Sequence, residues 1–365
     1  LARAAGGMTP FTYDQLPARI VFGAGRLAEG GAEAERLDGQ RVMLISDWAA
    51  TAPAAAVTAQ LGSRLALAWD EVAQHVPVEL ADRARAAASE ANIDCVVCIG
   101  GGSSTGLAKA LALSHGVPIL AVPTTYAGSE QTPIYGLTGG RHKQTGKNPI
   151  VQPKTVVYDP ELTVGLPPQV TGPSAFNALA HSVESLYAPG HNPITSVLAL
   201  EGVRAIHDSL PTVMTSPGDV DARGTLLYGA YLSGVALGTT AAGLHHKLCH
   251  VLGGRFNLVH ADAHSVILPH AIAFNAPALP DEMARLAAAL GAPGGNPASA
   301  LWDLAVASNV PTRLADLAGH DGLLKLDDLA GAAHAAAEEI TVNPRPVTEA
   351  DLLGILERAY EGERP

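Results

Sequence analysis

DCVVCIGGGSSTGLAKA, residues 94–110, passes from an apolar run through three glycines into a helix-forming segment. A strand, a glycine loop and a helix in this order bring backbone N–H groups and a helix N-terminus onto a phosphate group. Glycine suits such a loop because a β-carbon would hold a pyrophosphate away from the backbone. The run does not follow the GxGxxG pattern, so a plain tight turn is the alternative. We expect Gly101, Gly102 and Ser103 to bind a dinucleotide.

The same alternation of apolar runs and alanine-rich stretches extends from Phe11 to about Pro160. It is typical of a mostly parallel, doubly wound α/β sheet. The pattern predicts strands over 19–22, 41–46, 95–99, 119–122 and 155–158, and helices over 26–36, 53–61, 78–91 and 104–113. After residue 166 long Ala/Leu-rich segments take over. We therefore predict a Rossmann-like α/β domain over 8–162 and an all-helical domain over 163–365, since 365 residues exceed what one core usually supports.

Composition argues against several classes of protein. The net charge of -12, without a Lys/Arg run, disfavours nucleic acid and anionic membranes as partners. The sequence contains no uninterrupted apolar stretch of about eighteen residues, so a membrane span is not expected. Three cysteines are too few for a disulfide framework, so a cytoplasmic location is expected. We interpret Cys95 and Cys98 as part of a buried strand rather than as a redox pair. The residues before Met8 lack the apolar run of a signal peptide, and we interpret Met8 as the native start.

Polar side chains follow two more of the predicted strands. Asp47 ends the strand over 41–46, where a carboxylate could bind the adenosine ribose and repel a 2′-phosphate, although capping a helix is an equal alternative. Thr124, Thr125 and Ser129 follow the strand over 119–122 in PTTYAGSE. Loops at the carboxyl edge of one parallel sheet share a crevice, so we expect these residues to bind NADH, with NADPH as the second possibility.

Six of the fourteen histidines lie in GLHHKLCHVLGGRFNLVHADAHSVILPH, residues 243–270. A helix over 243–252 would place His246 and His250 on one face, and a bend after Gly253-Gly254 would lead to His260, with His264 at i+4. Asn177 and His181, one helical turn apart in FNALAH, share a face in the same way. A lone histidine is usually a structural or exposed residue. This density instead favours one common site.

These motifs, together with ARIVFGAG (18–25), HVPV (75–78) and NPRPVTEADL (343–352), cover nearly the whole chain. In combination the sequence resembles the iron-containing (group III) alcohol dehydrogenase superfamily and, within it, the maleylacetate reductase family. The resemblance implies a dehydroquinate synthase-like architecture, with a dinucleotide-binding domain, an all-helical domain and an active site between them. It also implies a homodimer and matches Lys143 to a lysine that reaches the cofactor in relatives.

In metal-dependent members an aspartate and three histidines bind iron or zinc, and by motif these positions are Asn177, His181, His246 and His260. An amide at 177 removes the only anionic ligand, so a divalent cation loses much of its electrostatic stabilisation. Gly106, where many dehydrogenases of the superfamily carry Asp, agrees with the reductase subgroup. The resemblance therefore implies that no metal is expected.

The expected reaction is reduction of the C=C bond of maleylacetate, or a substituted analogue, to 3-oxoadipate in aromatic-compound degradation. The substrate would be a small dicarboxylate. We expect His181, His246, His250 and His260 to donate hydrogen bonds to the enolate oxygen, one of them also serving as general acid. Candidate partners for the substrate carboxylates are Lys247, Arg255 and Arg345. Three alternatives stay open: a metal-dependent alcohol or polyol dehydrogenase, a cyclase or lyase on the related fold that uses NAD transiently, and a non-catalytic dinucleotide-binding regulator.

Overall fold

The computed structural model describes residues 11–14, 18–139, 142–319 and 322–365. Met8 lies outside this part. The first half is built on a six-stranded sheet whose strands run parallel in the order β1-β8-β5-β4-β2-β3. The strands are β1 (Arg19–Phe22), β2 (Val42–Ser46), β3 (Leu65–Trp69), β4 (Cys95–Gly100), β5 (Ile119–Pro123) and β8 (Thr155–Tyr158). This confirms the predicted α/β class; β3 was not predicted.

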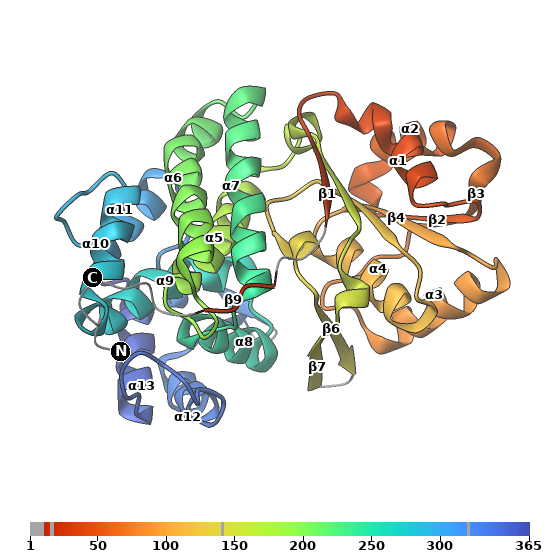
Figure 1. The fold of residues 1–365 in the computed structure, drawn as a ribbon. Coiled ribbons are helices and arrows are strands. Elements are labelled where there is room, and N and C mark those ends of the chain that lie inside the picture. Colours follow the sequence, from red (N-terminus) through yellow and green to blue (C-terminus); the bar gives the residue numbers. More distant parts are fainter. Residues whose placement is uncertain (1–10, 15–17, 140–141, 320–321) are drawn as a thin grey trace.

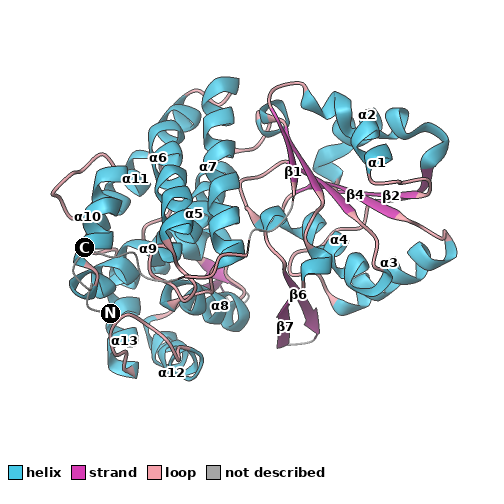
Figure 2. Cartoon of the chain, viewed as in Figure 1, coloured by secondary structure: helices cyan, strands magenta, loops and turns pink. Residues whose placement is uncertain are grey.

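Helices cover both faces of the sheet, as Figures 1 and 2 show. Helices α1 (Gly30–Arg36) and α2 (Thr51–Leu61) pack on one face, and α3 (Val78–Glu90) and α4 (Gly102–His115) pack on the other. Strands β4 and β5 are buried at every position, as expected of central strands with helices on both sides. An antiparallel hairpin, β6 (Ile134–Gly139) and β7 (His142–Lys147), projects from this half.

The second half is helical, as predicted. Its helices are α5 (Pro168–Ser185), α6 (Pro193–Thr215), α7 (Val220–Thr239), α8 (Leu244–Phe256), α9 (His260–Asn275), α10 (Pro280–Ala289), α11 (Pro297–Ala307), α12 (Leu329–Glu339) and α13 (Glu349–Glu361). Two-residue strands, β9 (Ala318–Gly319) and β10 (Gly322–Leu323), interrupt them. None of the described helices is long and apolar enough to cross a membrane.

The bend predicted after Gly253-Gly254 is wrong. Helix α8 continues through both glycines to Phe256 and ends where Asn257 adopts a left-handed conformation with φ 55°. Buried side chains such as Leu248 and Leu252 pack α8 into an apolar cluster with α9, α12 and α13. This packing outweighs the low helix propensity of glycine.

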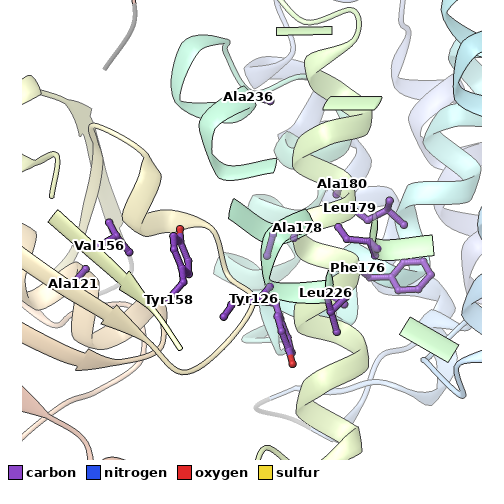
Figure 3. Close-up of a cluster of buried hydrophobic side chains, with 14 of the residues drawn as sticks. Ala121, Tyr126, Val156, Tyr158, Phe176, Ala178, Leu179, Ala180, Leu226 and Ala236 are labelled. Carbon is purple, nitrogen blue, oxygen red and sulfur yellow. The ribbon is translucent and has the colours of Figure 1, made fainter. Parts of the chain in front are cut away.

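One apolar cluster joins the two halves. Figure 3 shows Val156 and Tyr158 of the sheet in the same cluster as Phe176 of α5 and Leu226 of α7. Tyr126, in the loop after β5, adds polar contacts: its hydroxyl accepts a hydrogen bond from Arg223 Nη1 at 3.0 Å. The division predicted after residue 162 falls within a short 3-10 helix over 160–163 and stays a prediction. The shared cluster fixes the loop after β5 against the helices.

Candidate active site

Two loops at the carboxyl edge of the sheet lie against each other. Strands β4 and β5 are neighbours, and Thr124 N donates to Gly100 O at 3.0 Å. A β-carbon on Gly101 would lie 3.1 Å from the Thr125 side chain, and one on Gly102 would lie 3.7 Å from Ser129 Oγ. Helix α4 begins at Gly102, so its N-terminus faces this contact. The structure thus brings the predicted glycine-loop residues, Ser103 with them, next to Thr124, Thr125 and Ser129.

Two hydroxyls at these loops lack a partner among the described residues. Ser104 Oγ and Ser129 Oγ are both buried without a hydrogen bond. Buried polar atoms are rarely left unpaired in folded proteins, and such atoms at a helix N-terminus suit an anionic ligand. The loops therefore have the features of a phosphate-binding site.

Asp47 is engaged in capping. Its Oδ1 accepts from Ala49 N at 3.0 Å and from Ala50 N at 3.1 Å, which begins the short 3-10 helix over 48–50. A β-carbon on Gly100 would lie 2.9 Å from Asp47 Oδ2, so the second oxygen lies beside the glycine loop. Capping therefore accounts for Oδ1 of Asp47, whereas Oδ2 lies next to the glycine loop. Lys143 belongs to β7, but its side chain lies outside what the structure describes.

The loop after β5 meets the helical half at one backbone carbonyl. Ala127 O lies 3.2 Å from His181 Nε2 and 3.4 Å from Asn177 Nδ2. A carbonyl only accepts, so His181 donates through Nε2. Asn177 Oδ1 is buried without a partner among the described residues. Asn177 and His181 thus lie beside the loop after β5.

Six imidazole rings form one group, which we call the imidazole cluster: His181 of α5, His245, His246 and His250 of α8, and His260 and His264 of α9. Ring centroids are 5.0 Å apart for His181 and His246, and 5.6 Å apart for His250 and His260. His264 lies 4.9 Å from His246 and 4.3 Å from His260, so it links the two pairs. The structure therefore brings together all four histidines predicted for the site.

The sequence reasoning missed Glu184. This carboxylate, buried in α5, accepts from Gly243 N at 3.0 Å, from His245 N at 2.7 Å and from His246 Nδ1. Burial by itself would raise the pKa of Glu184, but the charge and hydrogen bond of His246 outweigh it and lower the pKa to about 2. A signal was present, because Glu184 follows His181 by three residues and so lies on the same helical face.

The hydrogen bonds of His181 and His246 determine how many N–H groups the pair needs. Ala127 O and the ionised Glu184 can only accept, and His181 Nδ1 lies 2.8 Å from His246 Nε2. Three hydrogen bonds need three N–H groups, whereas two neutral imidazoles supply two. A third N–H would complete this set of hydrogen bonds, and the Glu184 carboxylate would balance its charge. Burial lowers the pKa of His181 well below its usual value.

A second set of side chains has ligand geometry. The ligand atoms of His245, Cys249 and His264 all lie within 4.8 Å of one another, and each residue is fully buried. His245 Nε2 is 2.8 Å from His264 Nδ1 and 3.7 Å from Cys249 Sγ. Two imidazoles and a thiol are donors that zinc and other divalent transition metals accept. These three residues could hold a metal ion.

The three candidate cations for the substrate carboxylates contact groups outside the imidazole cluster. Lys247 forms an ion pair with Glu339 at 3.4 Å. Arg345 Nη1 donates to Phe274 O at 3.0 Å, and the Arg255 guanidinium lies 5.8 Å from the Phe256 ring centroid. The geometry singles out none of them.

Comparison with known proteins gives matches over most of the chain. Residues 17–160 match the family described as iron-containing alcohol dehydrogenase, and residues 171–360 match the C-terminal part of the Fe-containing alcohol dehydrogenase family. A maleylacetate reductase of Burkholderia cepacia is 46% identical over 98% of this chain and 100% of its own length. Maleylacetate reductase 2 of Cupriavidus pinatubonensis is 47% identical over 99% of both chains.

Solved structures agree with these matches. The maleylacetate reductase of Agrobacterium tumefaciens aligns with a TM-score of 0.92 at 43% identity, covering 98% of this chain and 100% of that one. The enzyme of Rhizobium sp. strain MTP-10005 aligns with the same score at 44% identity over the same shares. A 1,3-propanediol oxidoreductase, at 23% identity and a TM-score of 0.87, shares the fold.

The expectation that no metal is bound is wrong. The family that matches this chain is described as iron-containing, and His245, Cys249 and His264 form a group that could hold an ion. The expectation considered only the donor set that includes Asn177, where an amide replaces a carboxylate. The second set supplies its own anion when the Cys249 thiol ionises on binding a cation.

Family matches, relatives and fold all lead to the same assignment. The relatives are reductases, and this chain is an oxidoreductase. The chain belongs to the iron-containing alcohol dehydrogenase family and, within it, to the maleylacetate reductase group.

Proposed function

We propose that the protein reduces the carbon–carbon double bond of maleylacetate to give 3-oxoadipate, with NADH as hydride donor, in the degradation of aromatic compounds. The observation that carries the proposal is the buried pair His181–His246. His181 Nδ1 lies 2.8 Å from His246 Nε2, and His181 Nε2 donates to the loop after β5 at 3.2 Å. The relatives named maleylacetate reductase support the choice of substrate.

The double bond of the substrate is conjugated with a ketone, and this determines the chemistry. Hydride from NADH forms a C–H bond at the carbon β to the ketone, and the electron pair of the double bond moves towards the ketone oxygen, which becomes an enolate. A proton then bonds to the α-carbon as the carbonyl reforms, and NAD⁺ remains. The site must stabilise an oxyanion and supply one proton.

The residues of this chain can meet both demands. The proton shared by His181 and His246 would be delivered to the α-carbon, and solvent would replace it. The partly exposed His250 and His260 would donate hydrogen bonds to the enolate oxygen. Asn177 would orient the ketone through its side-chain amide. Gly101, Gly102, Ser103, Thr124, Thr125 and Ser129, with Asp47 and Lys143, would bind NADH.

A metal ion fits His245, Cys249 and His264 by the chemistry and spacing of their donor atoms. When bound there, it would supply a fixed positive charge close to the His181–His246 pair, since the rings of His264 and His246 lie 4.9 Å apart. The same observation favours a second candidate, metal-dependent reduction of an aldehyde or ketone.

A spectrophotometric screen of NADH and NADPH against maleylacetate and a panel of aldehydes and ketones tests the proposal. We expect rapid oxidation of NADH with maleylacetate, one NADH for each substrate molecule. Oxidation with aldehydes alone would select the second candidate. Turnover of substrate without consumption of NADH would indicate a cyclase or lyase.

A homodimer in the cytoplasm also remains a proposal, supported by the resemblance to the superfamily. Size-exclusion chromatography with light scattering would test it, and a monomer at micromolar concentration would contradict it.

A further inference from the structure

We infer that Glu184 is a positioning residue, which holds the His246 ring with Nε2 directed at His181 while the same carboxylate begins helix α8. The inference rests on the proposed function for its kinetic consequence and on geometry alone for the positioning. It adds to the reaction a side chain that need not touch the substrate.

The first observation concerns the start of α8. The N-cap residue, Gly243, has no side chain to accept the first N–H groups of the helix. Glu184 accepts them instead, from Gly243 N at 3.0 Å, His245 N at 2.7 Å and His246 N at 3.4 Å. A β-carbon on Gly243 would lie 2.6 Å from Glu184 Oε1, so glycine leaves room for the carboxylate. The cap of α8 therefore comes from α5.

The second observation concerns the His246 ring. With Nδ1 donating to Glu184, Nε2 faces His181 Nδ1 at 2.8 Å, and the two rings are nearly parallel, with an interplanar angle of 19°. His181 and Glu184 lie one turn apart on α5 and both contact this ring. One helical turn thus sets the orientation of the ring and its partner. A carboxylate that hydrogen-bonds one nitrogen of an imidazole fixes which nitrogen is available for chemistry.

Glu184→Gln is the main test, because it keeps the size of the side chain but leaves one acceptor oxygen where there were two. We expect kcat to fall about 10- to 100-fold, while the Kd of NADH stays unchanged because the glycine loop is not altered. In a double-mutant cycle, E184Q/H246Q should be no slower than H246Q, since Glu184 acts through His246.

A matched control is Asn192→Ala, which removes the side chain that caps α6 through Ile194 N and Thr195 N, at 3.0 and 3.1 Å. It should turn over at the rate of the wild type once folded.

Two results would overturn the inference. One is a near-normal kcat in folded E184Q. The other is a fold-decrease in kcat in E184Q/H246Q that equals the product of the fold-decreases in the two single variants. If E184Q does not fold, ¹H NMR of the wild type decides, because an imidazole N–H bonded to a carboxylate resonates far downfield. We expect such a signal in the wild type and its loss in H246Q; a wild type without it would contradict the inference. This signal does not depend on substrate, so failure to reduce maleylacetate would refute the proposed function alone.

Discussion

His246 is hydrogen-bonded to both Glu184 and His181, so it joins the carboxylate to the rest of the site. Replacing it with glutamine removes an imidazole that can donate both a proton and a hydrogen bond. We expect His246→Gln to lower kcat about 100- to 1000-fold, the loss that follows removal of one oxyanion donor in other enzymes. The measurement is NADH oxidation at saturating maleylacetate.

His334→Gln is the control, because the His334 side chain is 66% exposed and far along the chain from the cluster. It should leave turnover unchanged. A folded H246Q that retains wild-type turnover would rule out His246 as proton donor.

At this scale the sequence predicted part of the site. A spacing of four residues placed Asn177 with His181 and His246 with His250, because residues four apart share a helical face. His245 points away from that face of α8, and only the packing of α9 against α8 covers it with His264. Sequence spacing within one helix cannot tell which other helix lies beside it. Glu184 was missed for a different reason, because the predicted site was built from histidines and no carboxylate was considered as a partner for them.

Among the elements, α4 and the segment before β6 are joined by Lys109. This buried lysine donates from Nζ to Ser129 O, Thr132 O and Ile134 O, each at 2.7 Å. Burial lowers the pKa of Lys109 from 10.5 to about 7, against the opposing effect of Glu130. Between these two pH values the unfolded chain binds more protons than the folded one, so the contribution of Lys109 to the free energy of unfolding rises with pH.

Lys109→Met has no such titration. We expect the difference in free energy of unfolding, wild type minus K109M, to increase from pH 7 to pH 10 in urea titrations. We also expect K109M to bind NADH more weakly, because Ser129 lies in the loop proposed to bind the dinucleotide. A difference that stays constant with pH would show that Lys109 keeps its ordinary pKa.

Helix α7 approaches the loop after β5 at a pair of glycines. A β-carbon on Gly234 would lie 2.4 Å from Gly128 O, so Gly234→Ala must displace backbone next to Ala127. We expect a loss of about 1–3 kcal/mol in the free energy of unfolding, together with reduced turnover. Gly218→Ala, where the added β-carbon meets nothing within 4 Å, is the matched control. Equal stability of the two variants would contradict a close contact at this point.

Element by element, the predictions failed where tertiary packing overrides local pattern. LALAW in β3 resembles a helical stretch but pairs with β2 at the edge of the sheet. The β6–β7 hairpin has a polar second strand without apolar alternation. Strands with strong apolar runs, such as β4 and β8, were predicted to within a residue because buried parallel strands leave a clear composition signal.

Considering the whole molecule, metal content is the property most open to direct measurement. We expect the purified protein to carry about one iron or zinc ion per chain by elemental analysis, and Cys249→Ser to lower that content, because a serine is a poorer ligand than a thiolate. Chelation with EDTA should lower the thermal midpoint. A wild type without metal but with full activity would refute the metal site at His245, Cys249 and His264.

The apolar cluster that runs from the sheet into α5 and α7 restricts how this protein can be recombined with its relatives. A hybrid that exchanges the N-terminal half would place a foreign surface against Phe176 and Leu226. It would also separate Tyr126 from the buried Arg223 to which it is hydrogen-bonded. Functional chimaeras should therefore need a crossover that transfers the loop after β5 together with α5 and α7. Such a crossover keeps the residues of the apolar cluster from one parent, whereas a crossover at the boundary between sheet and helices would mix them.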